Sequence, residues 1–391
     1  PMLIEIHMLK NYPATNLNRD DSGAPKTCYF GGVQRGRISS QCQKRSWRTS
    51  PLFAMLESQG WRSRALPELV AAELTDLPEK AVIHAKKLIS TIGTSAKTQE
   101  KKAAKEEQDT ANNAAGKTPS VAASTTGQLI FFSPADVKAL AEAVRAIWQE
   151  NGESVPAFEK VKKSDAISSL VKNAAPRAIT LDIALFGRMT TSQAFVDVES
   201  AMQVAHAVST HAVNLESDYF TAVDDLLGAD SPGAGMIGDI DFDSCCYYQY
   251  ASLDMDKLRE NLKNSPEAQA RVGELLPVLL QVMAETNPSG KQNSFAGHVM
   301  PEAVMVEFKT EKIPLNYANA FAEPVSRYST HIAKDSTDKL AGEIDLMDDC
   351  YALPVTHRAW MALRSESQPK HCERFRQFRQ LCEACAQWAR E

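Results

Sequence analysis

The sequence predicts an α+β protein. Short apolar stretches with an alternating pattern lie far apart along the chain, and long amphipathic stretches with helical periodicity separate them. This distribution indicates an antiparallel sheet assembled from distant segments, with helices inserted between its strands. The 391 residues are 43% hydrophobic and 24% charged, which is typical of a globular chain and excludes a collagen, a coiled coil and a wholly disordered protein.

Four segments are predicted to be strands. Residues 2–9 are apolar with near alternation, and residues 236–253 alternate well and form the expected central strand. Residues 128–132 and 303–308 are short and rich in β-branched or aromatic side chains.

Residues 51–175 are predicted to be mainly helical, because several of their stretches are amphipathic. Within them, Ser133 followed by Pro134 has the pattern of an N-cap and a first helical residue. Residues 94–126 are rich in Ala, Lys, Glu, Ser and Thr with almost no large apolar residue, which predicts a mobile loop or a frayed helix.

Two more helices are expected after the central strand. Residues 258–286 form one helix, or two that meet near Pro277, because proline interrupts helical hydrogen bonding. Residues 367–391 carry apolar residues at helical spacing and form a closing helix.

Cysteine content and hydropathy indicate a cytoplasmic protein. Eight Cys residues are too few for a disulfide scaffold, which favours a reducing compartment. The most apolar stretch, residues 275–283, is far shorter than the roughly 20 residues of a membrane span. Glu5, His7 and Lys10 interrupt any hydrophobic region near the start, so we expect neither a signal peptide nor a membrane partner.

Charge is unevenly distributed along the chain. The formal net charge is −6, yet residues 10–48 hold eight Lys and Arg residues against two Asp residues, a net charge of +6, so the rest carries −12. A basic segment on an acidic body indicates a local site for a polyanion, and the alternative is an ordinary basic surface loop.

A polar, basic helix face follows this loop. The helix is expected from about Gln41, with Ser39 or Ser40 as its N-cap and Gln43 completing a weak capping box with Ser40. Lys and Arg side chains, hydroxyl groups and helix N-termini bind phosphates without reading bases. Spacings of three and four residues place on one face of this helix Gln41, Lys44, Arg45 and Arg48.

Several segments resemble one known family in its order. The segment Leu17-Asn-Arg-Asp-Asp-Ser-Gly-Ala-Pro-Lys and the segment from Phe30 to Arg45 are similar to the opening of the Cascade backbone subunit of type I-E CRISPR systems, the Cas-seven or CasC family. Together the similar segments span residues 3 to about 325. The further similar segments are residues 182–189, 205–213, 219–226, 290–296 and 318–321.

The resemblance implies a modified RRM-like (ferredoxin-like) palm, a helical fingers insertion and a protruding thumb. On this basis residues 1–50, 175–195 and 236–391 form the palm, residues 51–174 the fingers and residues 196–235 the thumb.

The resemblance also implies a non-catalytic protein without cofactors. Family members polymerise along the guide RNA (crRNA), hold its backbone and leave its bases free to pair with target DNA. The implied partners are crRNA, target DNA, other copies of the chain, and the capping, large, small and crRNA-processing subunits of Cascade.

The RNA-binding residues follow from matching positions in the family. The segment around Ser39–Arg48 lines the guide-RNA groove, Arg188 and Met189 lie near the displaced base, and residues 208–210 match the thumb tip. Arg37 is alternatively an ion-pair partner of Asp20 or Asp21. The predicted residues are Arg19, Lys26, Arg37, Ser39, Ser40, Gln41, Lys44, Arg45, Arg48, Arg188, Met189, Val208, Ser209 and Thr210.

Three other groups of residues carry weaker signals of a functional site. Asp239, Asp241 and Asp243 alternate with apolar residues, so we place all three on one strand face that is solvated or faces a neighbouring subunit, since the features of a calcium loop are missing. A zinc site is disfavoured because there is only one Cys-x-x-Cys pair among His371, Cys372, Cys382 and Cys385. His206 and His211 are structural or lie near RNA.

Two alternative functions remain open. A metal-dependent RNA endonuclease of the same superfamily predicts cleavage that Asp20→Ala or Asp225→Ala abolishes, although we interpret Asp20 and Asp21 as ion-paired residues that shape the basic loop. A scaffold that binds only protein predicts unchanged RNA affinity after Lys44→Ala with Arg48→Ala.

Overall fold

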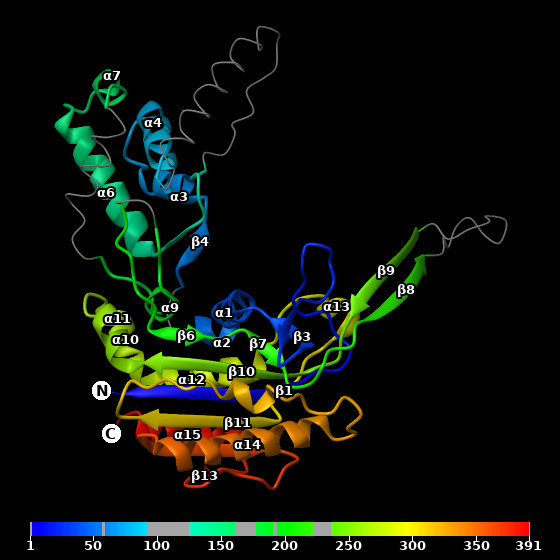
Figure 1. The fold of residues 1–391 in the computed structure, drawn as a ribbon. Helices are drawn as coiled ribbons and strands as arrows, with labels where there is room; N and C mark the ends of the chain where they lie inside the picture. The colour runs from blue at the N-terminus through cyan, green and yellow to red at the C-terminus, as the bar shows by residue number, and fades with distance from the viewer. Residues whose placement is uncertain are drawn as a thin grey trace, which may run out of the picture. The chain divides into compact units, whose positions relative to one another are not determined.

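The contacts in a computed structural model divide the chain into two compact units (Figure 1). The structure describes residues 2–56, 59–92, 125–161, 177–190, 194–222 and 236–390. Unit 1 comprises Pro1–Leu56, Met202–Asp256 and Arg271–Glu391, and unit 2 comprises Glu57–Ala201 and Lys257–Ala270. Most of the predicted 94–126 loop, and Asp225, lie outside the described residues. The predicted palm, fingers and thumb are not tested by this division and stay predictions.

Unit 1 is built on a sheet whose strand order is β13-β12-β11-β1-β10-β7-β3-β2, with β6 also paired to β10. The neighbours are antiparallel except β12 and β13, which are parallel. The non-sequential order confirms the predicted α+β class with a sheet assembled from distant segments. The strands are β1 (Leu3–Asn11), β2 (Thr27–Phe30), β3 (Val33–Ile38), β6 (Met202–Val204), β7 (Ala207–Ser209), β10 (Cys246–Asp254), β11 (Ala303–Lys309), β12 (Val355–Ala362) and β13 (Glu373–Arg374).

The predicted central strand 236–253 is wrong as a single element. The structure divides it into β9 (Met236–Phe242), which leaves the central sheet and pairs with β8 (Glu216–Ala222), and β10, which lies next to β1. The division falls at Asp243, whose backbone exchanges hydrogen bonds with Thr15. The strands predicted at 2–9 and 303–308 are confirmed as β1 and β11.

Helices cover the sheet of unit 1. α14 (Ile332–Tyr351) and the 3-10 helix η1 (Tyr317–Phe321) bury apolar side chains against β10, β11 and β12, in a cluster that includes Ile344, Tyr248 and Trp360. Figure 1 shows α14 running along the sheet. The other helices of this unit are α1 (Ser40–Arg48), α2 (Pro51–Ala54), α12 (Val272–Glu285), α13 (Gln292–Phe295) and α15 (Phe378–Trp388).

Two helix predictions need correction. The segment 258–286 forms α10 (Met255–Asn261), α11 (Pro266–Ala270) and α12, with a break before Pro266, which occupies the first position of α11 because it lacks an N–H donor. Pro277 lies inside α12 rather than at a boundary. The closing helix begins only at Phe378, because the preceding residues pair with β12 as β13.

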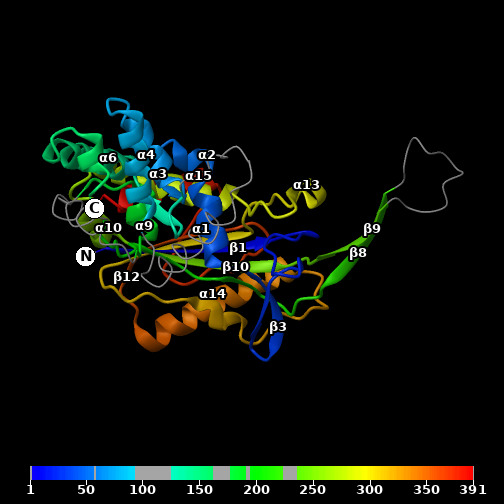
Figure 2. The same cartoon turned by 90° about the horizontal axis from the view of Figure 1, so that it is seen from above.

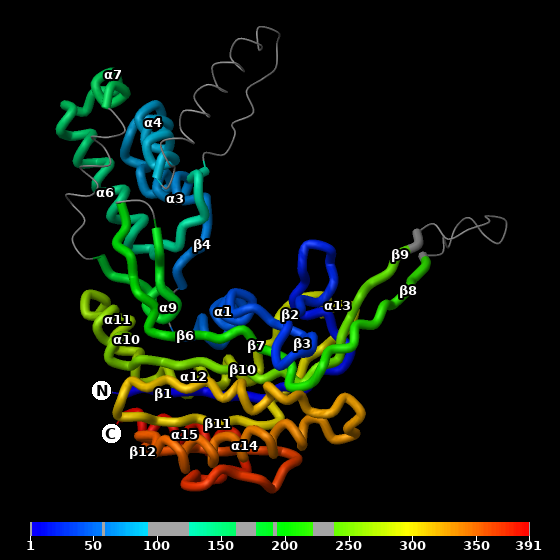
Figure 3. The backbone as a smooth tube through the Cα atoms, in the orientation of Figure 1, coloured from blue at the N-terminus to red at the C-terminus, as the bar shows by residue number. Residues whose placement is uncertain are grey.

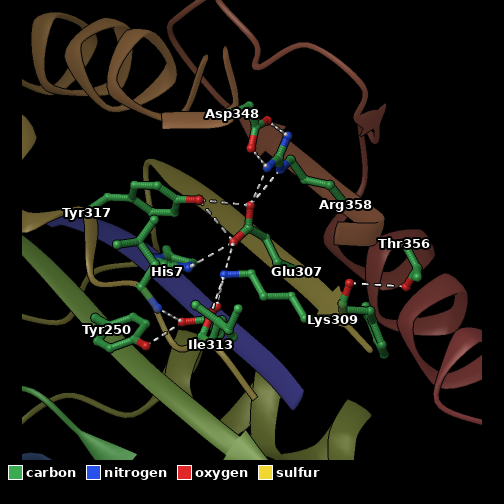
Figure 4. A network of polar contacts seen from close by, with 12 residues as sticks. His7, Tyr250, Glu307, Lys309, Ile313, Tyr317, Asp348, Thr356 and Arg358 are labelled. Carbon is green, nitrogen blue, oxygen red and sulfur yellow. Dashed lines mark hydrogen bonds and ion pairs between the residues drawn. The ribbon is translucent and has the colours of Figure 1, made fainter. Parts of the chain in front are cut away.

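Buried charges lie within the middle of the sheet (Figure 4). Glu5 on β1 forms an ion pair with Lys309 on β11, and it also accepts a hydrogen bond from the hydroxyl of Tyr250 on β10. Lys309 Nζ lies 3.7 Å from Glu307 Oε2. Glu5, Lys309 and Glu307 are all buried. Such groups are tolerated in a core only when they are paired, so these contacts hold β1, β10 and β11 in one register.

The same network continues to β12 and α14. Arg358 Nη2 lies 2.6 Å from Glu307 Oε1, and its Nη1 lies 2.7 Å from Asp348 Oδ2 on α14. Tyr317 donates a hydrogen bond of 3.3 Å to Glu307 (Figure 4). Burial, together with Lys309 and Arg358, holds the pKa of His7 well below its usual value, so His7 is neutral in this network.

Unit 2 is mainly helical in its described part, as predicted. Its core holds apolar side chains such as Leu66, Leu88, Leu140 and Phe158. Ser133 caps α6 in a capping box with Asp136, which confirms the predicted cap. The elements not yet named are α3 (Leu66–Glu73), α4 (Glu79–Ser90), α6 (Pro134–Glu150), α7 (Val155–Phe158), α9 (Leu181–Phe186), β4 (Trp61–Ser63) and β5 (Ile130–Phe132), which confirms the strand predicted at 128–132.

Candidate nucleic-acid interface

Two of the eight cations in the basic segment are buried. Lys10 lies in β1, where its Nζ donates to Thr286 O at 3.2 Å and to Asn287 Oδ1 at 3.4 Å. Burial lowers the pKa of Lys10 to about 7. Arg35, on β3, is also fully buried. The surface of this segment is therefore less basic than the sequence count indicates.

Arg35 connects three parts of unit 1. Its guanidinium donates to Phe30 O at 3.1 Å, to Ser209 O at 2.9 Å and to Phe321 O at 2.7 Å. It also lies 5.5 Å from the centroid of the Phe30 ring. A guanidinium carries five donors in a fixed plane, which suits it to satisfy carbonyls of the β2–β3 hairpin, β7 and η1 together. The role of Arg35 is thus to hold the hairpin on the sheet.

Four of the remaining cations define what we call the cationic surface: Arg19, Lys26, Arg37 and Arg45. All four are partly or fully exposed. No carboxylate of the described residues forms an ion pair with any of them. A group of cations without anionic partners on the protein is available to a polyanion.

Strand pairing brings Lys26 and Arg37 of the cationic surface next to each other. The backbone N–H of Arg37 donates to Lys26 O at 2.8 Å, which extends the β2–β3 pairing by one step. The Arg37 guanidinium bonds to Thr27 O at 3.1 Å and lies 3.0 Å from His206 Nδ1. Burial, then Arg37 and Lys26, lower the pKa of His206, so its neutral ring accepts from Arg37. The sequence left His206 as structural or near RNA, and its contact with Arg37 makes it a neighbour of this surface.

The acidic residues of the loop do not form the predicted ion pairs. Asp20 accepts hydrogen bonds from Ser22 N at 2.9 Å, Ser22 Oγ at 2.7 Å and Ala24 N at 3.1 Å. The Ser22 hydroxyl is the main cause that lowers the pKa of Asp20. In the described part of the chain, neither Asp20 nor Asp21 pairs with Arg37. Asp20 therefore shapes the loop by hydrogen bonding.

Helix α1 follows β3 directly (Figure 3). Ser39 is its N-cap: its hydroxyl accepts from Cys42 N at 3.3 Å, and its own N–H donates to Asn18 Oδ1 at 2.9 Å. The predicted capping box with Gln43 is wrong, because Gln43 is buried and donates to Ala205 O at 2.9 Å. Asn18 thus links the start of α1 to the loop that carries Arg19.

The predicted basic face of α1 is present. Gln41 and Arg45 are exposed, and Ser40, Lys44 and Arg48 are partly exposed. Trp47, on the opposite side with Gln43, is buried. The helix has no acidic residue in its first turn. The partial positive charge of its N-terminal N–H groups is therefore not offset there, and it has the same sign as the charge of the helix's cations.

Residues 208–210, which the resemblance matches to the thumb tip, belong to unit 1. They lie on or next to β7, inside the central sheet. Ser209 and Thr210 are buried: Ser209 Oγ accepts from Gly36 N at 3.0 Å and donates to His211 O at 2.6 Å, and Thr210 Oγ1 accepts from Ser336 at 2.8 Å. Both hydroxyls therefore serve the packing of unit 1.

Val208 alone of these three is partly exposed. It lies directly opposite Arg37 in the β3–β7 pairing, so the two side chains point to the same side of the sheet. Val208 thus joins the edge of the cationic surface.

His211 has a structural role. Its Nε2 accepts from Cys246 N at 3.3 Å and its Nδ1 donates to Ala212 O at 2.9 Å, while burial lowers its pKa.

In unit 2, Arg188 and Met189 have opposite surroundings. Arg188 is buried, where it forms an ion pair with Asp136 at 2.8 Å, donates to Val196 O at 3.1 Å and lies 5.3 Å from the Phe195 ring centroid. Met189, the next residue, is 93% exposed. Arg188 therefore fixes the segment that presents Met189 to solvent.

The candidate metal-binding residues are dispersed. Asp239 and Asp241 lie on β9, but Asp243 is buried and accepts from the Tyr247 hydroxyl at 2.9 Å, so the three do not share one solvated face. Burial raises the pKa of Asp243 to about 6. Cys382 and Cys385 are buried on α15. Within the described residues, no group of three His, Cys, Asp or Glu side chains could hold a metal ion.

The family of CT1975-like proteins matches residues 4–386 of the sequence. The chain belongs to the CT1975-like protein family. Its fold is similar to a chain of a structure described as "CRISPR RNA-guided surveillance complex, pre-nicking", with a TM-score of 0.78, 24% identity, and 99% and 100% of the two chains covered. A second such chain, of a "CRISPR RNA-guided surveillance complex", has a TM-score of 0.59 and 20% identity over 99% of each chain. No curated protein matches the sequence.

The predicted RNA-binding residues of this CT1975-like chain fall into three groups. The cationic surface, with Ser40, Gln41, Lys44, Arg48 and Val208, lies at the α1 end of the β2–β3 hairpin and its neighbours. Ser39, Ser209 and Thr210 are buried and structural. Arg188 and Met189 belong to unit 2. None of the helices in the described part of this CT1975-like chain is long and apolar enough to span a membrane.

Proposed function

We propose that this CT1975-like protein is a non-catalytic backbone subunit of a type I-E CRISPR Cascade complex in the cytoplasm. It binds crRNA through the cationic surface and α1, assembles in several copies along the guide, and leaves the bases free to pair with target DNA. Its other partners are the capping, large, small and crRNA-processing subunits. The observation that carries this proposal is the group of four partly or fully exposed cations beside the N-terminus of α1, which have no carboxylate partner among the described residues.

The chemistry of that surface suits a phosphate chain rather than a base. Lys and Arg side chains and helix N–H groups bind phosphate oxygens wherever the backbone passes, whatever the sequence. The guanidinium groups of Arg19, Arg37 and Arg45 offer paired donors for this purpose. Because each contact releases a counterion, affinity for RNA falls as salt rises. The two similar chains belong to structures described as RNA-guided, which supports the same class of ligand here.

The test compares a variant of the cationic surface with a variant of equal charge elsewhere. Arg19→Gln with Arg45→Gln removes two exposed cations of the surface, and Lys80→Gln with Lys138→Gln removes two exposed cations of unit 2. Affinity for short single-stranded RNAs of unrelated sequence is measured by fluorescence anisotropy over a range of salt. We expect the first variant to bind all the RNAs more weakly by the same factor, and its salt slope to fall by about 0.7 for each lost contact.

Four results would contradict the proposal. An equal loss of RNA affinity in the control variant would mean that positive charge anywhere on the protein attracts RNA. A loss of affinity confined to one RNA sequence would indicate base readout. Unchanged affinity in the first variant would favour a scaffold that binds only protein. Incubation of RNA with the protein and Mg²⁺ is included, since cleavage that requires the metal would indicate an endonuclease.

A further inference from the structure

A cavity in unit 2 is lined by side chains of both signs of charge. Its volume is about 390 Å³, within the range of pockets that bind small molecules. Its lining residues come from the described parts of 136–199 and from 257–264. Figures 1 and 2 both show α9, within the first segment, beside α10, and Asn261 Nδ2 on α10 donates to Ala184 O on α9 at 3.0 Å. We call this the arginine cavity, because Arg177 and Arg188 line it.

The most buried charges of the arginine cavity are two arginines and one aspartate. Arg188 Nη1 lies 2.8 Å from Asp136 Oδ2, and Arg177 Nη1 lies 3.6 Å from Asp136 Oδ1. The exposed fractions of the three side chains are 4% for Arg188, 12% for Arg177 and 1% for Asp136. Two guanidinium groups beside one carboxylate leave one positive charge in excess, and a buried charge is costly when it lacks a counter-ion.

The carboxylate of Asp136 is also engaged by the start of α6. Its Oδ2 accepts from Ser133 N at 2.8 Å and from Ser133 Oγ at 3.0 Å in the capping box, in addition to Arg188 Nη1. The N-terminus of α6 adds partial positive charge at the same place. Asp136 therefore does not balance both guanidinium groups.

The two arginines keep donors that the described residues do not use. Arg177 Nη1 donates to Ala194 O at 3.2 Å, while Arg177 Nε is buried and has no hydrogen-bond partner among the described residues. Arg188 donates through Nε to Val196 O and through Nη1 to Asp136, so that within the described part of the chain its Nη2 remains for a further contact. A buried donor without an acceptor costs free energy, so both arginines are suited to an acceptor that a ligand brings.

The more exposed lining residues have the opposite excess of charge. The side chains of Asp197, Glu199 and Glu260 are exposed. Lys257 Nζ lies 3.2 Å from Glu199 Oε2 and 3.2 Å from Glu260 Oε2, and Lys263 is the second cation of this rim. A polyanion held by the arginines would place its further charges against the three carboxylates, whereas a compact ligand with one anionic group would not.

We propose that the arginine cavity binds a compact oxyanion, the carboxylate or phosphate group of a small molecule, on the guanidinium groups of Arg177 and Arg188. A guanidinium is planar and presents paired donors that match both kinds of anion. The anion supplies the missing counter-charge and an acceptor for Arg177 Nε. The inference goes beyond the proposed function, because the ligand is not a nucleic acid and the cavity lies in unit 2, whereas the cationic surface lies in unit 1.

Calorimetric titration of the full chain tests the arginine cavity. The protein is titrated with inorganic phosphate and, separately, with acetate, at an ionic strength held constant with sodium chloride. We expect saturable binding of one anion per chain, and the tighter of the two anions identifies the ligand group as phosphate or carboxylate. Arg177→Gln should weaken this binding about tenfold or more, because hydrogen bonds from a charged donor are lost. Arg62→Gln is the control, since it removes an exposed arginine of the same unit on β4 and should leave the affinity unchanged.

A conservative variant separates binding from folding. Arg177→Lys keeps a positive charge near Asp136 but lacks the paired donors of a guanidinium. Its thermal unfolding in chloride should therefore stay close to that of the unchanged protein, while its affinity for the anion should lie between those of Arg177→Gln and Arg62→Gln. If Arg177→Gln does not fold, the comparison of Arg177→Lys with Arg62→Gln decides.

The inference and the proposed function fail in different ways. Absence of saturable binding of either anion, or equal anion affinity in Arg177→Lys and Arg62→Gln, would overturn the inference. Displacement of the bound anion by a short single-stranded RNA would also overturn it, because the cavity would then belong to an RNA interface. If the unchanged protein bound no RNA, the proposed function would fail, and the titration with phosphate and acetate would still decide whether the cavity binds an oxyanion.

Discussion

At the scale of single residues, the burial of a charge decides its role. Lys10 and Arg35 lie in the most basic part of the sequence, yet both are buried and bind carbonyl or amide oxygens of their own chain. Arg45, ten residues after Arg35, is exposed. Only exposed cations such as Arg45 are available to a ligand, because a buried cation already binds partners within the protein.

Lys10 predicts a dependence of stability on pH. Its pKa is about 7 in the folded protein and about 10.4 when unfolded, so the unfolded chain binds more protons between these values. The penalty of burying Lys10 is complete below about pH 7 and disappears as pH rises toward about 10.4, so this group makes stability rise with pH.

Lys10→Met isolates this effect, because Asn287 Oδ1 keeps its hydrogen bond from Tyr12. Free energies of unfolding in urea are measured for both proteins at pH 7 and 9.5. The variant should be the more stable one at pH 7, and its advantage should shrink by about 3 kcal/mol at pH 9.5. Titration of the buried thiols is common to both proteins and cancels. A difference that stays constant with pH would show that Lys10 keeps an ordinary pKa.

At the scale of elements, the cap of α1 has both a structural and an electrostatic consequence. Ser39→Ala removes the acceptor for Cys42 N and should lower the free energy of unfolding by about 1 kcal/mol. Ser39→Asp keeps an acceptor and is favourable at a helix N-terminus, so its stability should stay close to that of the unchanged protein.

RNA affinity separates the two consequences. The carboxylate introduced by Ser39→Asp would add a negative charge beside the cationic surface, so we expect S39D to bind RNA more weakly than S39A although it is the more stable of the two. Chemical denaturation and fluorescence anisotropy on the same preparations check this. RNA affinities that simply follow stability would mean that α1 does not face the RNA.

The elements also show where sequence periodicity is reliable. The strands at 2–9 and 303–308 and the cap at Ser133 were predicted, because alternation and capping are local signals. The division of residues 236–253 into β9 and β10 was not predicted, since both halves alternate in the same way in sequence. The bridge between Asp243 and Thr15 lies where they separate. The late start of α15 depends likewise on pairing of the preceding residues with β12.

At the scale of the whole molecule, each unit has apolar clusters of its own among the described residues. One set of apolar residues, around Leu140, belongs entirely to unit 2, and others, around Trp360 and Tyr247, belong to unit 1. The buried ion pairs of Glu307 lie in unit 1. We therefore expect a substitution in the core of one unit to lower the thermal stability of that unit.

Two variants test this separation in calorimetry. Glu307→Gln removes the negative charge that pairs with the buried guanidinium of Arg358, and it should destabilise unit 1 by about 3 kcal/mol or more. Leu140→Ala should destabilise unit 2 by about 2–5 kcal/mol, because Leu140 is fully buried. Each variant should lower a different thermal transition. A single transition that both variants lower alike would show that the two units unfold together.

The α+β class, several strands and helix caps, and the position of the basic segment could all be predicted from the amino-acid sequence. These follow from signals within a few residues: periodicity, capping residues and local charge. Tertiary structure alone decided which cations are exposed, that His206 and Val208 lie beside Arg37, that residues 208–210 belong to the sheet, and that Glu5, Glu307, Lys309 and Arg358 form a buried network. The physical reason is that burial and pairing depend on contacts between segments up to hundreds of residues apart, which no local pattern records.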